Sequence, residues 1–140
     1  MKLNPQISLG FNGQCEAAFR FYEQNLNGTV TYMLKWGDSP MAAEAPPGFA
    51  SKIAHATLKV GELGIAGSDV PPDRYEAPQG FQILLNMDDP IAAERIFQAF
   101  AQDGKVLVPL AETFWAARFG VVVDRFGIAW SINAEKAVAP

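Results

Sequence analysis

Apolar positions along the chain follow two different periods, and the change from one to the other marks the predicted elements. From about Gln14 to Leu26, apolar side chains recur three or four residues apart, which predicts one face of a helix. A second stretch with this period follows Asp89-Pro90, where Asp89 is suited to cap a helix and Pro90 to occupy its first turn. The predicted inward faces of the two helices are Cys15, Ala18, Phe19, Tyr22 and Leu26, and Ala93, Ile96, Phe97 and Phe100.

Between the helical stretches, short apolar or alternating segments are bounded by turn residues and predict strands. The turns include Gly61-Glu62 and Asp124–Gly127, in which Gly127 can adopt a positive φ. The predicted strands are Gln6–Phe11, Thr29–Trp36, Lys52–Val60 and Leu63–Gly67 in the first half, and Phe81–Met87, Lys105–Leu110, Phe119–Asp124 and Ile128–Asn133 in the second.

The two halves repeat each other. The segment 17–22 aligns with 92–97, and Asn27-Gly28-Thr29-Val30 aligns with Asp103-Gly104-Lys105-Val106. Each half has the order β-α-β-β-β, so we predict an α+β fold rather than a doubly wound parallel sheet. We expect a single domain over 1–140, with modules at about 1–70 and 79–134 that form a curved mixed sheet around a cleft.

Composition narrows the possible functions. The chain has 140 residues, a formal net charge of −4 and no basic cluster, which disfavours binding to nucleic acid. Its single cysteine and single histidine exclude a cysteine-based zinc site and sites that need several imidazoles. Because no secretory signal, long apolar run or glycine-rich phosphate loop occurs, we expect a cytoplasmic protein without membrane contact or cofactor.

Five strings, in this order, resemble the PhnB-like branch of the vicinal oxygen chelate superfamily, which includes glyoxalase I, bleomycin-resistance proteins and extradiol dioxygenases. They are FNGQCEAAFRFY (11–22), IAHA (53–56), AGSD (66–69), TFWA (113–116) and DRFGIAWSIN (124–133). The resemblance covers almost the whole chain and implies the paired-module fold. It says little about activity, because this scaffold carries many chemistries. Some PhnB-like sequences carry a ubiquinone-methyltransferase label, but no string here resembles a nucleotide-methyl-donor site.

Enzymes of this superfamily usually hold a divalent metal with a histidine at the start of a module's first strand and a glutamate on its last strand. Counting from the aligned helices places these positions on Gln6, Ile65 or Ala66, Gln82 and Ser131. None of them supplies an imidazole or a carboxylate, so we expect no metal there. The resemblance instead implies that Gln6, Gln82 and Ser131 serve as neutral hydrogen-bonding groups in an apolar cleft.

Three further residues are candidates with two interpretations each. His55, the one side chain that ordinarily titrates near neutrality, either faces the cleft as an acid or base or is a structural residue. Trp115 either walls the pocket or fills a dimer interface. Glu112 either lies near the mouth of the cleft or forms a surface pair with Arg118. Cys15 lies on the apolar helix face, which predicts a buried and unreactive thiol.

Our leading hypothesis is a protein that binds a small molecule in the cleft without the family metal, through Gln6, His55, Gln82, Trp115 and Ser131. The alternative is a lyase, isomerase or dioxygenase-type enzyme that acts on a small carbonyl or aromatic substrate. It would use His55 or Glu112 for catalysis, or hold a divalent metal with these two residues. The relatives implied by the resemblance are commonly dimers, so we also expect a homodimer.

Overall fold

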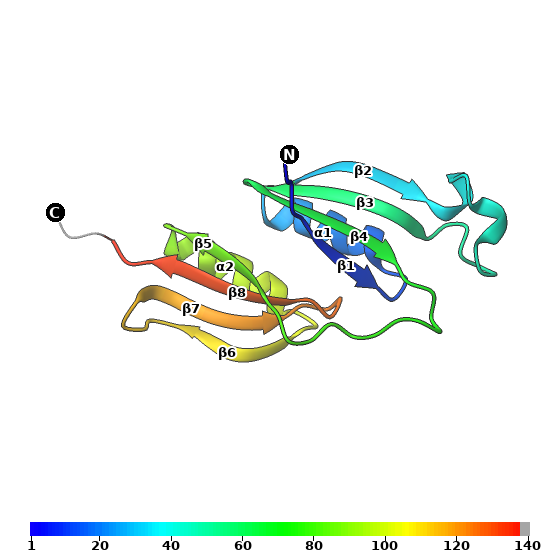
Figure 1. The fold of residues 1–140 in the computed structure, drawn as a ribbon. Helices are drawn as coiled ribbons and strands as arrows, with labels where there is room; N and C mark the ends of the chain where they lie inside the picture. Colours follow the sequence, from blue (N-terminus) through cyan, green and yellow to red (C-terminus); the bar gives the residue numbers. More distant parts are fainter. Residues whose placement is uncertain (138–140) are drawn as a thin grey trace. The chain divides into compact units, whose positions relative to one another are not determined.

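The structure is a computed structural model that describes residues 1–137, and it divides into two compact units, Met1–Glu76 and a second that begins at Ala77. The first unit contains β1 (Ile7–Phe11), α1 (Cys15–Asn25), β2 (Thr29–Lys35), β3 (Ile53–Val60) and β4 (Leu63–Asp69) (Figure 1). The second contains β5 (Ile83–Met87), α2 (Pro90–Ala101), β6 (Lys105–Ala111), β7 (Ala116–Val123) and β8 (Ala129–Glu135). Both units have the predicted β-α-β-β-β order, which confirms the α+β fold class.

The strands of each unit form a mixed sheet of four strands. The order in sheet A is β1-β4-β3-β2, and the order in sheet B is β5-β8-β7-β6. The first and last strands of each unit pair in parallel, while the other neighbours pair antiparallel. β2 and β6 are therefore corresponding edge strands of the two repeats.

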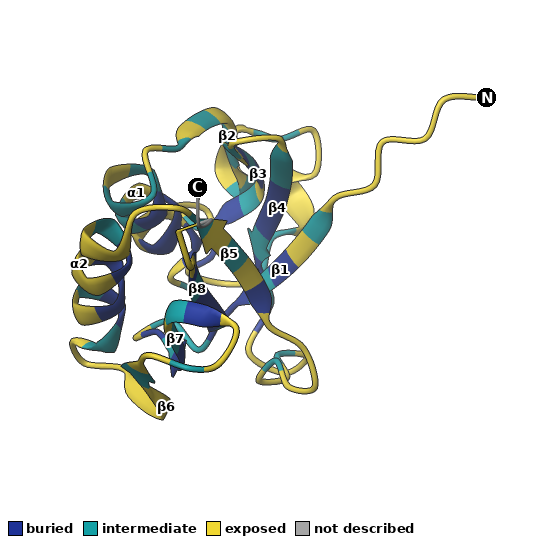
Figure 2. Cartoon of the chain, turned by 90° about the vertical axis from the view of Figure 1, so that its left-hand side faces the viewer, coloured by how far each residue is buried: buried dark blue, intermediate teal, exposed yellow. Residues whose placement is uncertain are grey.

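One face of each sheet is covered by the helix of its own unit, and the core lies between them. In the first unit, Phe19 of α1 meets Phe11 of β1 edge-on, with ring centroids 6.0 Å apart. In the second unit, Trp130 of β8 is fully buried and meets Phe100 of α2 edge-on at 5.2 Å. Figure 2 shows the buried residues on the sheet-facing sides of both helices and exposed residues on their outer sides. The helix faces predicted from periodicity are thus the packed ones, except that Leu26 lies just beyond the end of α1 and is only partly buried.

The two helices begin in different ways. The Asp89 side chain accepts hydrogen bonds from the backbone N–H groups of Ile91 and Ala92, as predicted for the cap of α2. Gln14, at the corresponding position before α1, makes no side-chain cap. Instead, Asp69 at the end of β4 caps α1 from a distant part of the sequence. Its buried carboxylate accepts hydrogen bonds from the backbone N–H groups of Cys15 and Ile53, at 2.9 and 2.8 Å.

In the pairs Asn27-Gly28 and Asp103-Gly104, which follow the two helices, the first residue has the positive φ. Asn27 and Asp103, not the glycines that follow them, have a positive φ, of 53° and 58°. Both side-chain types tolerate this conformation. Gly104 is needed for space instead, because a Cβ there would collide with backbone oxygens of Phe100 and Val123.

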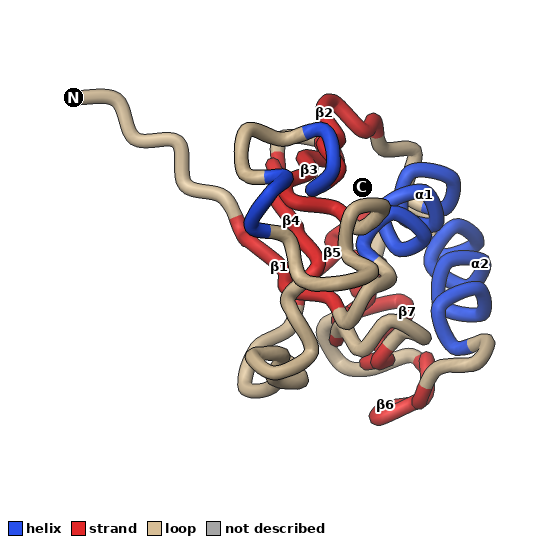
Figure 3. The backbone as a smooth tube through the Cα atoms, turned by 90° about the vertical axis from the view of Figure 1, so that its right-hand side faces the viewer, coloured by secondary structure: helices blue, strands red, loops and turns tan. Residues whose placement is uncertain are grey.

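Two element predictions need correction. Trp36, expected as the last residue of a strand, instead begins a short 3₁₀ helix, Trp36–Asp38, and a second one follows at Ala42–Glu44 before β3; helices are blue in Figure 3. β7 begins at Ala116, three residues before the predicted Phe119, because a turn built on Thr113 leads directly into the strand. In the described part of the chain, no helix has the length and apolar character needed to cross a bilayer.

Candidate functional site

The face of sheet B that points away from α2 carries two of the predicted site residues, Gln82 and Ser131. Trp130 points to the helix side, so its neighbour Ser131 points to the opposite face. There the Ser131 hydroxyl donates a hydrogen bond to the Gln82 side-chain oxygen, which joins β8 to the residue just before β5. Ser131 is only 6% exposed, so the hydroxyl group that orients the Gln82 amide has little contact with water.

A hollow of about 660 Å³ lies on this face of sheet B. Its lining is mostly apolar and contains no charged side chain: Pro78, Gln79, Gly80, Phe81, Gln82, Leu84, Leu107, Phe119, Val123, Gly127, Ala129 and Ser131. A few polar groups within an apolar concave surface are typical of small-molecule sites. We call this region the sheet B hollow.

Trp115 lies on the turn between β6 and β7 beside the sheet B hollow, and it is not among the residues that line the hollow. Its ring meets Phe119, a lining residue, at 5.2 Å, and meets Phe114 at 4.7 Å on the other side. The Thr113 hydroxyl accepts from the N–H groups of Trp115 and Ala116 and so fixes the turn. Trp115 is 47% exposed and Phe114 is 89% exposed.

A second polar pair follows the first along β5 and β8. The Asn133 side chain, two residues beyond Ser131 on the same face, donates to the Asn86 side-chain oxygen at 3.0 Å. The Asn133 side-chain oxygen is buried and accepts no hydrogen bond from any described residue.

The matching face of sheet A is polar. Gln6 lies with its amide over Gly64 and lines a smaller hollow of about 380 Å³ together with Asn4, Thr31, Thr57, Leu58, Lys59, Glu62 and Gly64.

In the first module, the glutamate position of the family falls on either Ile65 or Ala66, and strand pairing decides between them. Ala66 pairs with Ser8 as Ser131 pairs with Leu84, so Ala66 is the counterpart of Ser131, whereas Ile65 is fully buried on the helix side.

Within the part of the chain that the structure describes, neither proposed catalytic side chain has a partner that would activate it. His55 is exposed on β3, with its ring 6.0 Å from that of Tyr32. Glu112 contacts Lys136 at 3.9 Å, and Arg118 donates to the Ala117 carbonyl oxygen. The surface pair of Glu112 with Arg118 therefore does not form. The roles of His55 and Glu112 stay predictions.

The residues at the family metal positions do not fit a divalent transition metal. The first unit offers the amide of Gln6 and the methyl group of Ala66, and the second offers the Gln82 amide and the Ser131 hydroxyl, which bond to each other. Among residues 1–137, no three side chains of His, Cys, Asp or Glu gather in a way that could hold a metal ion.

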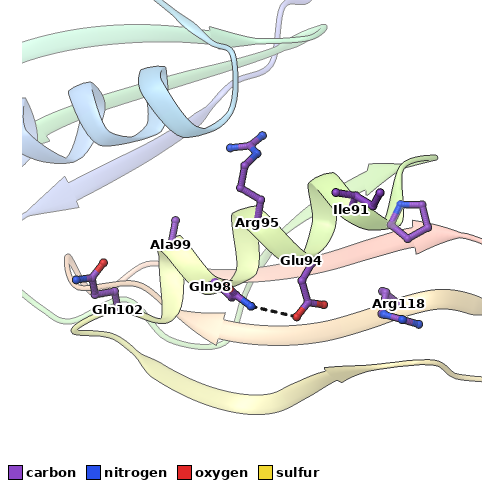
Figure 4. Close-up of a pocket in the computed structure, with 8 residues that line it drawn as sticks. Ile91, Glu94, Arg95, Gln98, Ala99, Gln102 and Arg118 are labelled. Atoms are coloured by element: carbon purple, nitrogen blue, oxygen red, sulfur yellow. Dashed lines mark hydrogen bonds between the residues drawn. The ribbon is translucent and has the colours of Figure 1, made fainter.

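Two other features, the Cys15 thiol and a groove along α2, do not form reactive or binding sites. Burial raises the pKa of the Cys15 thiol well above its ordinary value, and the Asp69 and Glu16 carboxylates add to this, so the thiol is protonated and a poor nucleophile. An open groove on the outer side of α2 is lined in part by Glu94, Arg95 and Arg118 (Figure 4). Glu94 accepts from Gln98, and the two arginines project in different directions, so they do not converge on one ligand.

Sequence reasoning missed several residues of the sheet B hollow, above all Leu84, Leu107 and Phe119. The alternation within 81–87 could have placed Leu84 on the same face as Gln82. Phe119 is the first residue of its predicted strand, whereas β7 begins at Ala116, so alternation within the predicted strand does not determine which face Phe119 is on. Leu107 lies at an irregularity in the pairing of β6 with β7, where alternation does not predict the face.

Comparisons with known proteins agree with this architecture. The family model described as 3-demethylubiquinone-9 3-methyltransferase matches residues 4–133. Protein YjdN of Escherichia coli (strain K12) is 33% identical over 144 residues, covering 97% of each chain. The solved structure of protein PA1353 from Pseudomonas aeruginosa is 45% identical, has a TM-score of 0.84, and the match covers 96% of this chain and 100% of that one.

More distant solved structures share the fold. A PhnB protein from Bacillus cereus, a putative 3-demethylubiquinone-9 3-methyltransferase, is 21% identical with a TM-score of 0.79, and the match covers 94% of this chain and 99% of that one. A glyoxylase/bleomycin resistance protein/dioxygenase domain from Frankia sp. EAN1pec is 13% identical with a TM-score of 0.63, covering 97% and 99%. On the family match and the identity to YjdN, the chain belongs to the family described as 3-demethylubiquinone-9 3-methyltransferase, and it shares its fold with the PhnB protein and with the glyoxylase/bleomycin resistance protein/dioxygenase domain.

Proposed function

We propose that this protein binds a small, largely apolar molecule in the sheet B hollow without a metal at the family positions. The observation that carries the proposal is the lining of the hollow, where apolar and aromatic side chains surround the Gln82–Ser131 pair and no charged side chain takes part. Such a lining stabilises a ligand through apolar burial and orients it through a few hydrogen bonds.

The methyl transfer named in the family description is not part of this proposal, because the sequence contains nothing that resembles a nucleotide-methyl-donor site. The exposed ring of His55 and the exposed Glu112 carboxylate likewise offer no activated acid or base. Binding is the function that the residues of the sheet B hollow support best.

The test uses prodan, a neutral and flat naphthalene ketone whose fluorescence shifts to the blue in apolar surroundings. We expect saturable binding, with about 10-fold weaker affinity in Phe119→Ala, because that substitution removes an aromatic wall. Leu84→Asp should weaken binding further, because it places a carboxylate in the apolar lining. Leu84 is 53% exposed, so this variant should fold normally.

The repeat supplies a matched control. Ser8 is the counterpart of Leu84 in strand pairing and is also exposed, so Ser8→Asp adds the same charge to sheet A and should leave prodan binding unchanged. Equal affinity of Leu84→Asp and the unmodified protein would overturn the proposal. So would a stoichiometric transition metal in the purified protein, measured by elemental analysis, because the proposal excludes a resident metal at the family positions.

A further inference from the structure

We infer that Asn12, in the connection between β1 and α1, is a site of spontaneous covalent modification, at which the Asn12-Gly13 pair forms a succinimide that opens to aspartate or isoaspartate. The inference does not depend on the proposed function. It comes from comparing Asn12-Gly13 with a second pair of the same two residue types in the same unit, Asn27-Gly28, because the structure surrounds the two pairs differently.

The chemistry requires only the two residues and water. The backbone nitrogen of the glycine gives up its proton and attacks the side-chain carbonyl carbon of the asparagine. The new C–N bond closes a five-membered ring, and the side-chain nitrogen leaves as ammonia, taking up the proton. Water then opens the ring at either of its two carbonyl groups, which produces aspartate or isoaspartate. Glycine favours the attack because it has no Cβ to obstruct the approach.

The Asn27-Gly28 pair, just after α1, is protected. The Gly28 N–H donates to the Glu23 carbonyl oxygen at 3.2 Å, and the Glu23 carboxylate accepts from the N–H of Val30 at 2.8 Å. Asn27 has a φ of 53°, and a Cβ on Gly28 would lie 3.1 Å from the Lys59 carbonyl oxygen. The Gly28 nitrogen must therefore leave its hydrogen bond, in a closely packed turn, before it can attack.

The Asn12-Gly13 pair lacks these restraints. Within residues 1–137, the Gly13 N–H has no hydrogen-bond acceptor, and Asn12 does not have a positive φ. Asn12 and Asn27 are both exposed, so access to water does not distinguish them. Gly13 has a φ of 85°, which favours glycine, so the turn itself requires the residue that makes Asn12 reactive.

Lys52 adds a positive charge beside the attacking residue. Its ammonium group donates to the Gly13 carbonyl oxygen at 2.9 Å and lies 3.5 Å from the position that a Cβ on Gly13 would take. A nearby cation favours the deprotonated form of a group that becomes an anion. Lys52 therefore promotes loss of the proton from the Gly13 nitrogen, and among the described residues no cationic side chain donates to Gly28 in this way.

Peptide mapping by mass spectrometry tests the inference on the full chain. Trypsin cleaves after Lys2, Arg20 and Lys35, so Asn12 and Asn27 fall on separate peptides, 3–20 and 21–35. During incubation of the folded protein at neutral pH, we expect Asn12 to convert about 5- to 10-fold faster than Asn27, the factor that one hydrogen bond contributes. Unfolding the chain in urea should bring the two rates together, because both asparagines then stand between a large apolar residue and a glycine.

Other asparagines do not confuse the measurement. Asn4 shares the first peptide with Asn12, but it precedes Pro5, which has no N–H to attack with. Asn25 shares the second peptide with Asn27, and fragmentation of the peptide separates them. Anion exchange of the intact protein gives a second readout, because each conversion makes the formal net charge of −4 more negative by one unit. Asn12→Gln should remove most of the acidic product.

Variants of Lys52 test its charge separately from its packing. Lys52→Met should slow the conversion of Asn12 about 2- to 5-fold, the size of the effect of a partly exposed charge, without changing that of Asn27. Lys52→Arg keeps the charge and should retain the fast rate. Lys105→Met, which removes an exposed lysine from the second unit, is the matched control and should change neither rate. All three substitutions leave both peptides intact.

Three results would overturn the inference: equal conversion of Asn12 and Asn27 in the folded protein, faster conversion of Asn27, or a preference for Asn12 that persists unchanged in urea. The last would show that local sequence, rather than the structure, selects the site. If Lys52→Met reacts at Asn12 as fast as the unmodified protein or faster, the assignment of Lys52 is wrong.

Discussion

Removing the Asp69 carboxylate should be among the most damaging single changes in the first unit. Asp69 is 2% exposed and accepts from two backbone N–H groups, those of Cys15 at the start of α1 and Ile53 at the start of β3. Asp69→Ala leaves both donors buried without an acceptor, at about 1–3 kcal/mol each. We therefore expect the free energy of unfolding to fall by about 4 kcal/mol, a large share of the stability of a small protein.

Urea unfolding followed by circular dichroism measures this loss. For a slope of about 2 kcal/mol per molar urea, a loss of that size moves the midpoint by about 2 M. Native-state hydrogen exchange adds local evidence, because the amides of Cys15 and Ile53 should lose protection selectively. Asp73→Ala, an exposed aspartate in the same unit, is the control and should change stability by less than about 0.5 kcal/mol.

The reasoning predicts a contrast with the other helix. Asp89 caps α2 at an exposed position, so Asp89→Ala should cost only about 1 kcal/mol. If Asp69→Ala destabilises the protein no more than Asp89→Ala does, the buried carboxylate does not organise the start of α1 and β3 as argued.

Further predictions concern titration and assembly. Burial raises the pKa of the Cys15 thiol above its ordinary value of about 8.5, so its contribution to stability is complete below that pH and is lost above it. The unmodified protein should lose about 1.4 kcal/mol per pH unit more than Cys15→Ala above about pH 8.5, measured by urea unfolding. The hydrogen bond from the backbone N–H of Val30 lowers the pKa of the Glu23 carboxyl group. The contribution of Glu23 to stability is therefore present above about pH 4.3 and is lost as the pH falls through the lowered pKa. Replacing Glu23 with Gln should flatten this part of the acid unfolding profile, and an unchanged profile would contradict it. We also expect a homodimer, so light scattering at micromolar concentration should give twice the chain mass of 15.2 kDa.

The parts of the fold that depend on neighbouring residues in sequence were predictable. Helical periodicity gave the buried faces of α1 and α2, and the Asp89-Pro90 pair gave the start of α2. The alternation of Trp130 and Ser131 placed them on opposite faces, and the packing of Trp130 against Phe100 determines which face is which. The family resemblance singled out Gln82 and Ser131 as site positions, but the hydrogen bond between them was not predicted.

Features that depend on residues distant in sequence were not predictable from patterns. Asp69 caps a helix that starts 54 residues earlier, and no local signal distinguishes it from a turn aspartate. The orientation of Leu107 depends on irregular pairing in β6, and the assignment of Ala66 rather than Ile65 required the pairing of β4 with β1. Register is a property of two strands, whereas periodicity describes only one.

The repeat indicates where the two units have specialised. Their helix-side faces remain apolar and aromatic, because each must bury a helix on a small sheet. The opposite faces are free of that requirement and have diverged: Thr57 and Lys59 face the hollow of sheet A, whereas Leu84 and Phe119 face that of sheet B. We expect binding chemistry at positions where the two units differ for reasons other than packing. A Thr57→Val substitution on sheet A should therefore leave the affinity for prodan unchanged, whereas Phe119→Ala should weaken prodan binding in the same assay. An equal loss of affinity in both variants would mean that the outer faces of the two sheets do not differ in function.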